Sequence, residues 1–175
     1  MKKAKQSLTH PDGFHGSVDE QLKFLEHLEK TRPPSVIEQS MGFIIASTMT
    51  RIRILMLRKI KEYGYDITPE QGAVLNAVGE SEGISQSMIA EKTLKDKPTI
   101  TRILDNLEKK SLISRKADSG DRRAYKIYLT GSGREKIEMF RRIIAEVDAK
   151  AFAGLDQKDL RKMEEILRAV RANVS

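Results

Sequence analysis

The chain contains no cysteine among its 175 residues. This absence excludes a disulfide framework, a thiolate zinc site, a thiol nucleophile and a thiol redox sensor. Long apolar runs are missing as well, since no stretch approaches the roughly 18 residues that a membrane helix needs. The N-terminal sequence MKKAKQSLTHPDGFHG lacks the apolar centre of a secretory signal. We therefore expect a cytoplasmic protein with no membrane partner.

The sequence motifs of common enzyme classes are also absent. There is no P-loop, GxSxG, HExxH or GxGxxG pattern. The three histidines, His10, His15 and His27, all lie near the N-terminus, and the rest of the chain has none to act as a base near neutral pH. Their spacing, without cysteine or carboxylate support, does not suit a metal site. We expect no enzymatic activity, no cofactor and no bound metal.

Composition indicates a globular chain with an excess of positive charge. Hydrophobic residues make up 39% and charged residues 33%, which suits one substantial domain or a small domain with helical extensions. The net charge is +7 and the isoelectric point is about 9.6. Such a charge favours an anionic partner, and the alternative is a protein that is simply basic.

The first part of the chain divides into a tail, a short helix and a long helix. Residues 1–34 read as an N-terminal tail followed by a helix from Ser17 that ends at the RPP sequence of 32–34. A long helix is expected from Ser35 to about Tyr63, with apolar side chains on more than one side. A helix of this kind must be buried on more than one side, so a partner subunit is the natural source of cover.

Residues 67–130 are predicted to form three helices followed by a hairpin. Thr68 and Pro69 open one helix, Ser85 opens a second, and a third runs from about Pro98 to Lys110. Two strands at 112–116 and 125–129 form a hairpin, and two helices follow at 131–150 and after Asp156. Two groups of apolar residues are expected to face inward on the third and the last helix: Ile100, Ile103, Leu104 and Leu107, then Leu160, Met163, Ile166, Leu167 and Val170.

The resulting fold class is mainly helical with a small wing of two or three strands. Two helices joined by a tight turn and followed by a hairpin form a winged helix-turn-helix, flanked by helical segments at 35–66 and 131–175. In such a module the second helix enters the major groove of DNA. Its outward residues would be Lys97, Pro98, Thr99, Thr101, Arg102, Asp105 and Asn106.

The outward residues suit contacts with bases and phosphates. Arginine makes a bidentate contact with guanine, and threonine contacts either a thymine methyl group or a phosphate. Between Ser85 and Thr130 there are eleven basic and six acidic residues, so most of the positive excess lies in this module. The alternative is a solvated helix face without a ligand.

Three segments resemble the MarR (multiple antibiotic resistance regulator) family of transcription factors. They are ITPEQGAVLNAV, ISQSMIAEKTLKDKPTITRILDNLEKKSLISRK and DSGDRRAYKIYLTGSG. The TxTR start of the reading helix, the DRRA tip and the LTxxG strand exit occur together in the family's order. The resemblance covers about Ile67 to Gly133, and the flanking helices fit it by position.

The resemblance implies a homodimer that reads a pseudo-palindromic operator in double-stranded DNA, with the helical segments at 35–66 and 131–175 as its dimerisation region. Residues Ser85, Gln86 and Ser87 would open the helix that contacts phosphates. Arg122 and Arg123 would lie in the wing, where one arginine enters the minor groove and another pairs with Asp121. The sequence leaves open which arginine has which role.

The resemblance further implies regulation by a small, often aromatic and anionic effector. The function expected is a repressor that this ligand releases from DNA. Phe43, Thr50, Met56 and Tyr63 on the long helix are candidate pocket residues, with core or interface positions as the alternative. A different class of function, a winged-helix module that binds proteins and not DNA, also remains open. The sequence does not decide between repression and activation.

Overall fold

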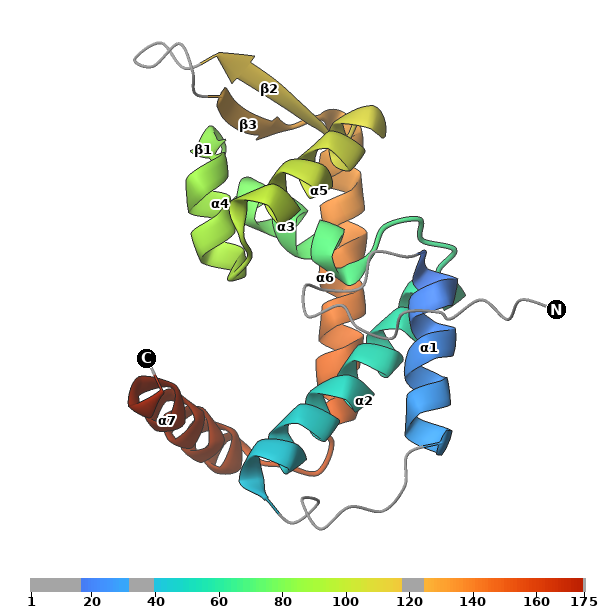
Figure 1. Cartoon of the computed structure of the whole chain (residues 1–175), viewed down its shortest axis with the longest axis vertical. Coiled ribbons are helices and arrows are strands. Elements are labelled where there is room, and N and C mark those ends of the chain that lie inside the picture. The colour runs from blue at the N-terminus through green and yellow to red at the C-terminus, as the bar shows by residue number, and fades with distance from the viewer. Residues whose placement is uncertain (1–16, 32–39, 118–124, 175) are drawn as a thin grey trace, which may run out of the picture.

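The structure is a computed structural model that describes residues 17–31, 40–117 and 125–174. The described part is mainly helical with one small sheet, as expected (Figure 1). In chain order the elements are α1 (Val18–Thr31), α2 (Met41–Glu62), α3 (Pro69–Glu80), β1 (Ile84–Ser85), α4 (Gln86–Thr93), α5 (Lys97–Lys109), β2 (Ile113–Ala117), β3 (Tyr125–Leu129), α6 (Gly131–Ala151) and α7 (Gln157–Asn173). Within these ranges no helix is both long and apolar enough to cross a membrane.

A winged helix-turn-helix occupies one end of the molecule. Figure 1 shows α3, α4 and α5 beneath the sheet, and α6 running from the sheet to α2. The sheet is antiparallel, with β3 between β1 and β2. Ile84 and Arg115 both lie opposite Ile127, one on each side of the central strand. The short strand β1 precedes α4 directly, so it ties the start of the helix-turn-helix to the wing.

The inner face of α5 forms the centre of the core, as its spacing predicts. Its four apolar side chains at positions 100, 103, 104 and 107 are all buried. They belong to one cluster with side chains from α3, the sheet and α6, such as Leu75, Ile127 and Ile143. Burial of side chains of this size stabilises the fold by about 1.5–3 kcal/mol each. Helix α5 is therefore held by its whole inner face.

Most helix starts agree with the caps expected from the sequence. Thr68 forms a capping box with Gln71, Ser85 caps α4, and Asp156 caps α7. The start of α2 differs, because the helix begins at Met41 and not at Ser35. Ser40 has an extended conformation, with φ −73° and ψ 139°, and its hydroxyl accepts a hydrogen bond from the Phe43 N–H. The serine cap therefore fixes the first turn six residues after the expected start.

Helix α1 packs along α2. Leu22 and Leu25 are buried against Ile54 and Leu57. Between the two helices the Gln21 side chain is fully buried, and its amide oxygen accepts a hydrogen bond of 2.7 Å from Arg53 Nη2. The same guanidinium nitrogen lies 2.5 Å from a carboxylate oxygen of Glu70 at the start of α3. Polar contacts thus connect α1 to α2, and α2 to the winged module.

Helix α7 does not bury the apolar face that its spacing predicts should face inward. None of its residues is buried, and Ile166, Leu167 and Val170 are 51%, 44% and 43% exposed. Figure 1 shows α7 pointing away from the body of the chain. The expectation of inward packing is wrong within one chain: these three side chains are exposed, and Leu160 and Met163, which border a groove beside the end of α6, are only half-buried.

The LTxxG sequence at the end of β3 has a specific packing role. The Thr130 hydroxyl donates to the Ser111 carbonyl (2.7 Å) and accepts from the Gly133 N–H (3.0 Å). Gly133 lies so close to the loop before β2 that a Cβ atom there would overlap the Leu112 carbonyl oxygen. Glycine at this position therefore lets α6 start directly against the wing.

We predict that Gly133→Ala destabilises the protein by about 2 kcal/mol, because the added methyl group overpacks a site bounded by backbone. Gly131→Ala is the matched control, since a Cβ atom there meets nothing within 4 Å and Gly131 is the first residue of the same helix. Thermal unfolding followed by circular dichroism measures both changes. Equal melting temperatures for the two variants would contradict the packing role.

Candidate nucleic-acid interface

The turn into the reading helix α5 is fixed by Leu94 and Asp96. Leu94 ends α4 in a left-handed conformation with φ 53°. Asp96 caps α5, accepting from the Thr99 N–H at 2.7 Å and from the Thr99 hydroxyl at 2.8 Å. The hydrogen bond from the Thr99 N–H, followed by that from its hydroxyl, lowers the pKa of the Asp96 carboxyl below its usual value. The first turn of α5 therefore has a defined orientation relative to α4.

The side of α5 opposite the core lies open to solvent. The residues predicted to face outward, apart from Thr99 and Asp105, are exposed: Lys97, Pro98, Thr101, Arg102 and Asn106. Thr99 and Asp105 are half-buried. The helix therefore presents two basic side chains, a proline and a threonine near its N-terminus. This is the end of a recognition helix that approaches base edges in helix-turn-helix complexes.

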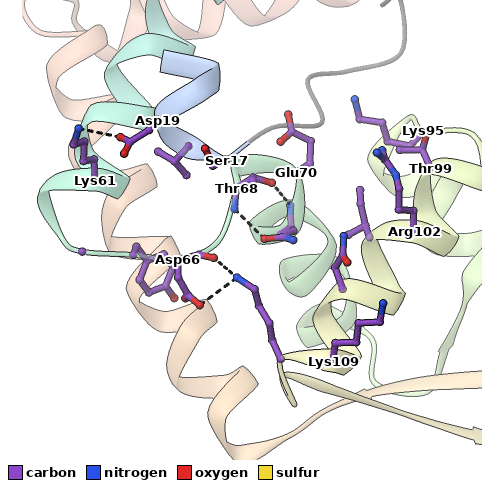
Figure 2. Close-up of a pocket in the computed structure, with 17 residues that line it drawn as sticks. Ser17, Asp19, Lys61, Asp66, Thr68, Glu70, Lys95, Thr99, Arg102 and Lys109 are labelled. Carbon is purple, nitrogen blue, oxygen red and sulfur yellow. Dashed lines mark hydrogen bonds and ion pairs between the residues drawn. The ribbon is translucent and has the colours of Figure 1, made fainter. Parts of the chain in front are cut away.

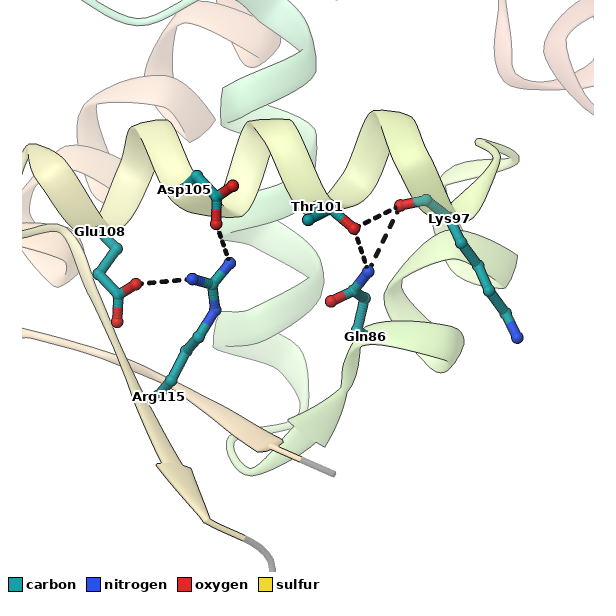
Figure 3. Close-up of polar contacts among 6 residues, drawn as sticks. All are labelled: Gln86, Lys97, Thr101, Asp105, Glu108 and Arg115. Carbon is teal, nitrogen blue, oxygen red and sulfur yellow. Dashed lines mark hydrogen bonds and ion pairs between the residues drawn. The ribbon is translucent and has the colours of Figure 1, made fainter. Parts of the chain in front are cut away.

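The start of α4 is hydrogen-bonded to the start of α5. Gln86 Nε2 donates to Thr101 Oγ1 at 2.6 Å and to the Lys97 carbonyl at 3.4 Å (Figure 3). The neighbouring Ser85 hydroxyl is used as the cap of α4, where it accepts from the Met88 N–H, whereas Ser87 is exposed. The three residues predicted to contact phosphates thus have different environments, and only Ser87 is fully exposed.

Arg115 connects the wing to the reading helix, a role that the sequence reasoning missed. From β2 its Nη2 lies 2.7 Å from Asp105 and its Nη1 lies 2.7 Å from Glu108 (Figure 3). The Arg115 side chain is only 20% exposed. In the sequence, the i, i+3 spacing of the two carboxylates on one helix face was the pattern that could have indicated a basic partner. The contact counters two negative charges that would otherwise lie unpaired beside the proposed DNA surface.

The tip of the wing, residues 118–124, lies outside the described residues. Asp121, Arg122 and Arg123 fall in this segment, so their predicted roles stay predictions. The flanking strands are described up to the pair Ala117 and Tyr125, which are opposite each other. Beside them the Lys116 ammonium lies 4.9 Å from the centre of the Tyr128 ring.

A pocket of about 700 Å³ opens beside α5 (Figure 2). Its walls come from the start of α1, the loop between α2 and α3, the start of α3, and α5. The outward residues Thr99, Arg102 and Asn106 belong to its lining. Five basic and three acidic side chains line the pocket: Lys61, Lys95, Arg102, Lys109 and Lys110, with Asp19, Asp66 and Glu70. Part of the proposed reading surface therefore also borders a basic pocket.

Ion pairs hold the rim of this pocket. Asp66 lies 3.1 Å from the Lys110 ammonium and 3.0 Å from that of Lys136, and Lys61 lies 2.9 Å from Asp19. The hydrogen bond from Lys136, followed by that from Lys110, lowers the pKa of the Asp66 carboxyl below its usual value. Asp66 therefore links the loop after α2 to the end of α5 and to α6.

The four candidate effector residues, three on α2 and Tyr63 directly after it, do not line one pocket. Met56 lines a pocket of about 710 Å³ between α2, α3, α4 and α6, but Phe43, Thr50 and Tyr63 lie outside it. Tyr63 is exposed, and its hydroxyl donates to Glu146 on α6. That hydrogen bond raises the pKa of Tyr63 and lowers the pKa of Glu146. Phe43 and Thr50 are half-buried in the N-terminal half of α2.

The described residues offer no metal site. Across residues 17–31, 40–117 and 125–174 no group of three histidine, aspartate or glutamate side chains is placed to hold a metal ion. His27 is exposed on α1, and His10 and His15 lie outside the described residues.

The sequence and the structure are both similar to known transcriptional regulators. The MarR family pattern matches residues 65–124. The transcriptional regulator HosA of Escherichia coli O127:H6 is 26% identical over 103 residues, which are 59% of this chain and 76% of HosA. A probable transcriptional regulator from Pseudomonas aeruginosa has a similar structure, with a TM-score of 0.70, 28% identity and coverage of 77% of this chain and 98% of the other.

A protein solved in complex with DNA has the same fold. MepR of S. aureus, in its DNA complex, gives a TM-score of 0.70 at 26% identity, covering 79% of this chain and 99% of MepR. The matched residues 65–124 include α3, α4 and α5, which carry the exposed basic reading face. The chain therefore belongs to the MarR family of winged helix-turn-helix, DNA-binding transcriptional regulators, which are not enzymes.

Proposed function

We propose that the protein is a homodimeric repressor that binds a pseudo-palindromic operator and is released from it by a small anionic ligand. The observation that carries the DNA-binding part is α5, which buries one face completely and exposes Lys97, Pro98, Thr101 and Arg102 on the other. An α-helix of this kind fits the major groove, which is about 12 Å wide. The similarity to MepR, which was solved with DNA, supports the same use of the winged module.

Within this proposal each contact has a stated role. Arg102 reads a guanine, and Lys97, Ser87 and the backbone near Pro98 lie along the phosphates. Asn106, on the exposed side of α5, lies at the edge of the major groove. In the wing, one of Arg122 and Arg123 enters the minor groove while Asp121 holds the other. The proposed domain division assigns residues 67–130 to reading DNA, 35–66 and 131–175 to dimerisation, and 1–34 to an extension that includes α1.

The unburied apolar faces support a dimer. Besides α7, the N-terminal half of α2 exposes Met41, Ile44 and Met49 by 68%, 44% and 59%. Two helices with exposed apolar faces at the same end of the molecule need a cover, and a second copy related by a twofold axis supplies matching faces. Such a dimer would place two reading helices in successive major grooves about one helical turn, roughly 34 Å, apart.

The basic pocket beside α5 supports control by an anionic ligand. Five basic side chains line it, and two of its residues, Arg102 and Asn106, are proposed DNA contacts. A ligand held there would favour a geometry in which α5 no longer fits the groove. It can shift the balance only by the difference between its affinities for the two geometries. The second pocket, at Met56, lies between α2 and the winged module and is the alternative site.

We predict that Arg102→Ala weakens binding to an operator by about 10- to 100-fold, because a bidentate arginine to guanine contact contributes about 1–3 kcal/mol. Wild-type affinity should also fall by at least about tenfold between roughly 50 and 200 mM salt. Fluorescence anisotropy with labelled DNA from upstream of the gene, or with a duplex selected from random sequences, measures both effects.

Lys30→Ala is the control for Arg102→Ala, since it removes one exposed positive charge at the end of α1. Binding that is unaffected by Arg102→Ala and insensitive to salt would contradict the DNA-reading role of α5. Failure to bind any duplex would instead favour a winged-helix module that binds proteins.

We expect Leu167→Asp to convert the dimer to a monomer, because it introduces a charge into the exposed apolar face of α7. Ala172→Asp is the matched control: it adds the same charge on the opposite, polar face of the helix. Light scattering after size-exclusion chromatography distinguishes the two forms. A dimer that survives Leu167→Asp would place the interface elsewhere.

We expect small aromatic carboxylates to lower DNA affinity more than sodium chloride does at the same ionic strength, because they bind the basic pocket as well as screening charge. Lys109→Ala, which changes the pocket lining outside the proposed DNA contacts, should reduce this extra effect. Anisotropy titrations over a panel of such acids provide the measurement. If every acid lowered DNA affinity only as much as sodium chloride does, the proposal that such a compound releases the protein from DNA would be wrong.

A further inference from the structure

Thr101 has a hydroxyl group whose only proton is already used. In α5 the Thr101 Oγ1 donates to the Lys97 carbonyl one turn earlier, at 2.9 Å. The same oxygen accepts a hydrogen bond of 2.6 Å from Gln86 Nε2 (Figure 3). A hydroxyl has one proton to donate. Although the Thr101 side chain is exposed, both hydrogen bonds of its oxygen are therefore made to groups of the same protein.

The Gln86 amide nitrogen is also hydrogen-bonded to α5. Its Nε2 contacts two acceptors, Thr101 Oγ1 at 2.6 Å and the Lys97 carbonyl at 3.4 Å. A carbonyl oxygen only accepts, so this second contact fixes which end of the amide faces α5. The two acceptors are themselves only 2.9 Å apart, so both lie on the same side of the Gln86 nitrogen. Gln86, Thr101 and Lys97 thus form a closed set of hydrogen bonds.

These hydrogen bonds favour one of the two possible DNA contacts of Thr101 over the other. Phosphate oxygens accept hydrogen bonds and donate none, so a phosphate contact would need the proton that the Lys97 carbonyl already holds. The Thr101 methyl group takes part in neither of these hydrogen bonds. Because threonine is branched at Cβ, the placement of its hydroxyl also fixes the direction of its methyl group. In the major groove the matching apolar group is the C5-methyl of thymine.

Thr99, the other threonine of the first turn, is a poorer candidate. Its hydroxyl donates to Asp96, its side chain is half-buried, and it lines the basic pocket. Thr101 is exposed on the flank of α5 that Gln86 approaches. The two threonines therefore have different uses, one in capping and one at the DNA-facing surface.

We infer that Thr101 reads a thymine through its methyl group, and that Gln86 is a positioning residue that holds Thr101 in the reading orientation and does not contact phosphate. This inference rests on the proposed function, since it names one base and one group in the operator. It replaces the phosphate role expected for Gln86 and decides between the two contacts open to Thr101.

The test uses a duplex that the wild-type protein has selected from a random pool, with each thymine replaced singly by deoxyuridine. That replacement removes only the C5-methyl group and leaves the protein unchanged. We expect one thymine in each half-site at which uracil weakens wild-type binding by about fourfold, the factor given by losing one buried methyl group. At other thymines the change should be small.

Two variants of Thr101 assign the effect to its methyl group. Thr101→Ser keeps the hydroxyl and removes the methyl group, so it should bind more weakly and no longer distinguish thymine from uracil at that position. Thr101→Val removes the hydroxyl but has methyl groups on both branches of Cβ, and valine has one strongly preferred rotamer in a helix, so the distinction should remain without the hydrogen bond from Gln86. The double-mutant cycle between protein and DNA isolates the contact.

Gln86→Met tests the positioning role. Loss of the amide should reduce the thymine preference at the same position, whereas loss of a phosphate contact would weaken binding to the thymine and uracil duplexes equally. The inference is overturned if the wild-type protein binds the selected duplex but no uracil substitution matters, or if Thr101→Ser keeps the preference. Selection of no duplex at all would overturn the proposed DNA-reading function itself, and the inference with it.

Discussion

Burial of the inner face of α5 is the constraint on which the rest of the structure depends. Ile100, Leu104 and Leu107 are fully buried and Ile103 nearly so, and they share one core with α3, the sheet and α6. A helix packed in this way has a fixed rotation about its own axis, so the residues on its other side have a fixed direction. The exposed positions of Lys97, Thr101 and Arg102 follow from this burial. A DNA-reading surface needs such rigidity because base contacts require alignment of single atoms.

Polar contacts then fix α5 relative to its neighbours along its length. Asp96 caps its first turn, Gln86 joins it to α4, and Arg115 joins it to the wing. Each of these contacts is exposed or half-buried, so each adds little to the free energy of folding. In the proposed function their main effect is on DNA binding. They pair carboxylates that would otherwise repel phosphate and fix the Thr101 hydroxyl, while the residues Lys97, Thr101 and Arg102 lie on the solvent-exposed side of α5.

The other end of the molecule is incomplete as a single chain. Apolar side chains on α7 and on the first half of α2 remain exposed, whereas the apolar face of α5 is buried. A second copy would cover them and would also set the distance between two reading helices. Stability of the helical region and spacing of the DNA contacts would then depend on the same interface. The basic pocket is lined by residues of α2, such as Lys61, and of α5, such as Arg102. It therefore lies between the helical region and the winged module.

The sequence by itself determined the element order apart from β1, most helix starts and the family. Caps such as Thr68 and Asp156 act within three or four residues, and the core face of α5 follows from a 3.6-residue period, so both can be read locally. The start of α2 at Met41 was missed although its Ser40 cap is also local. Tertiary structure decided the rest. It left α7 uncovered, brought Met56 but not Tyr63 into the pocket between α2 and α6, and joined Gln86 to Thr101 and Arg115 to Asp105. Those partners are ten or more residues apart, and their contact depends on how packed helices and strands meet, which no local pattern specifies.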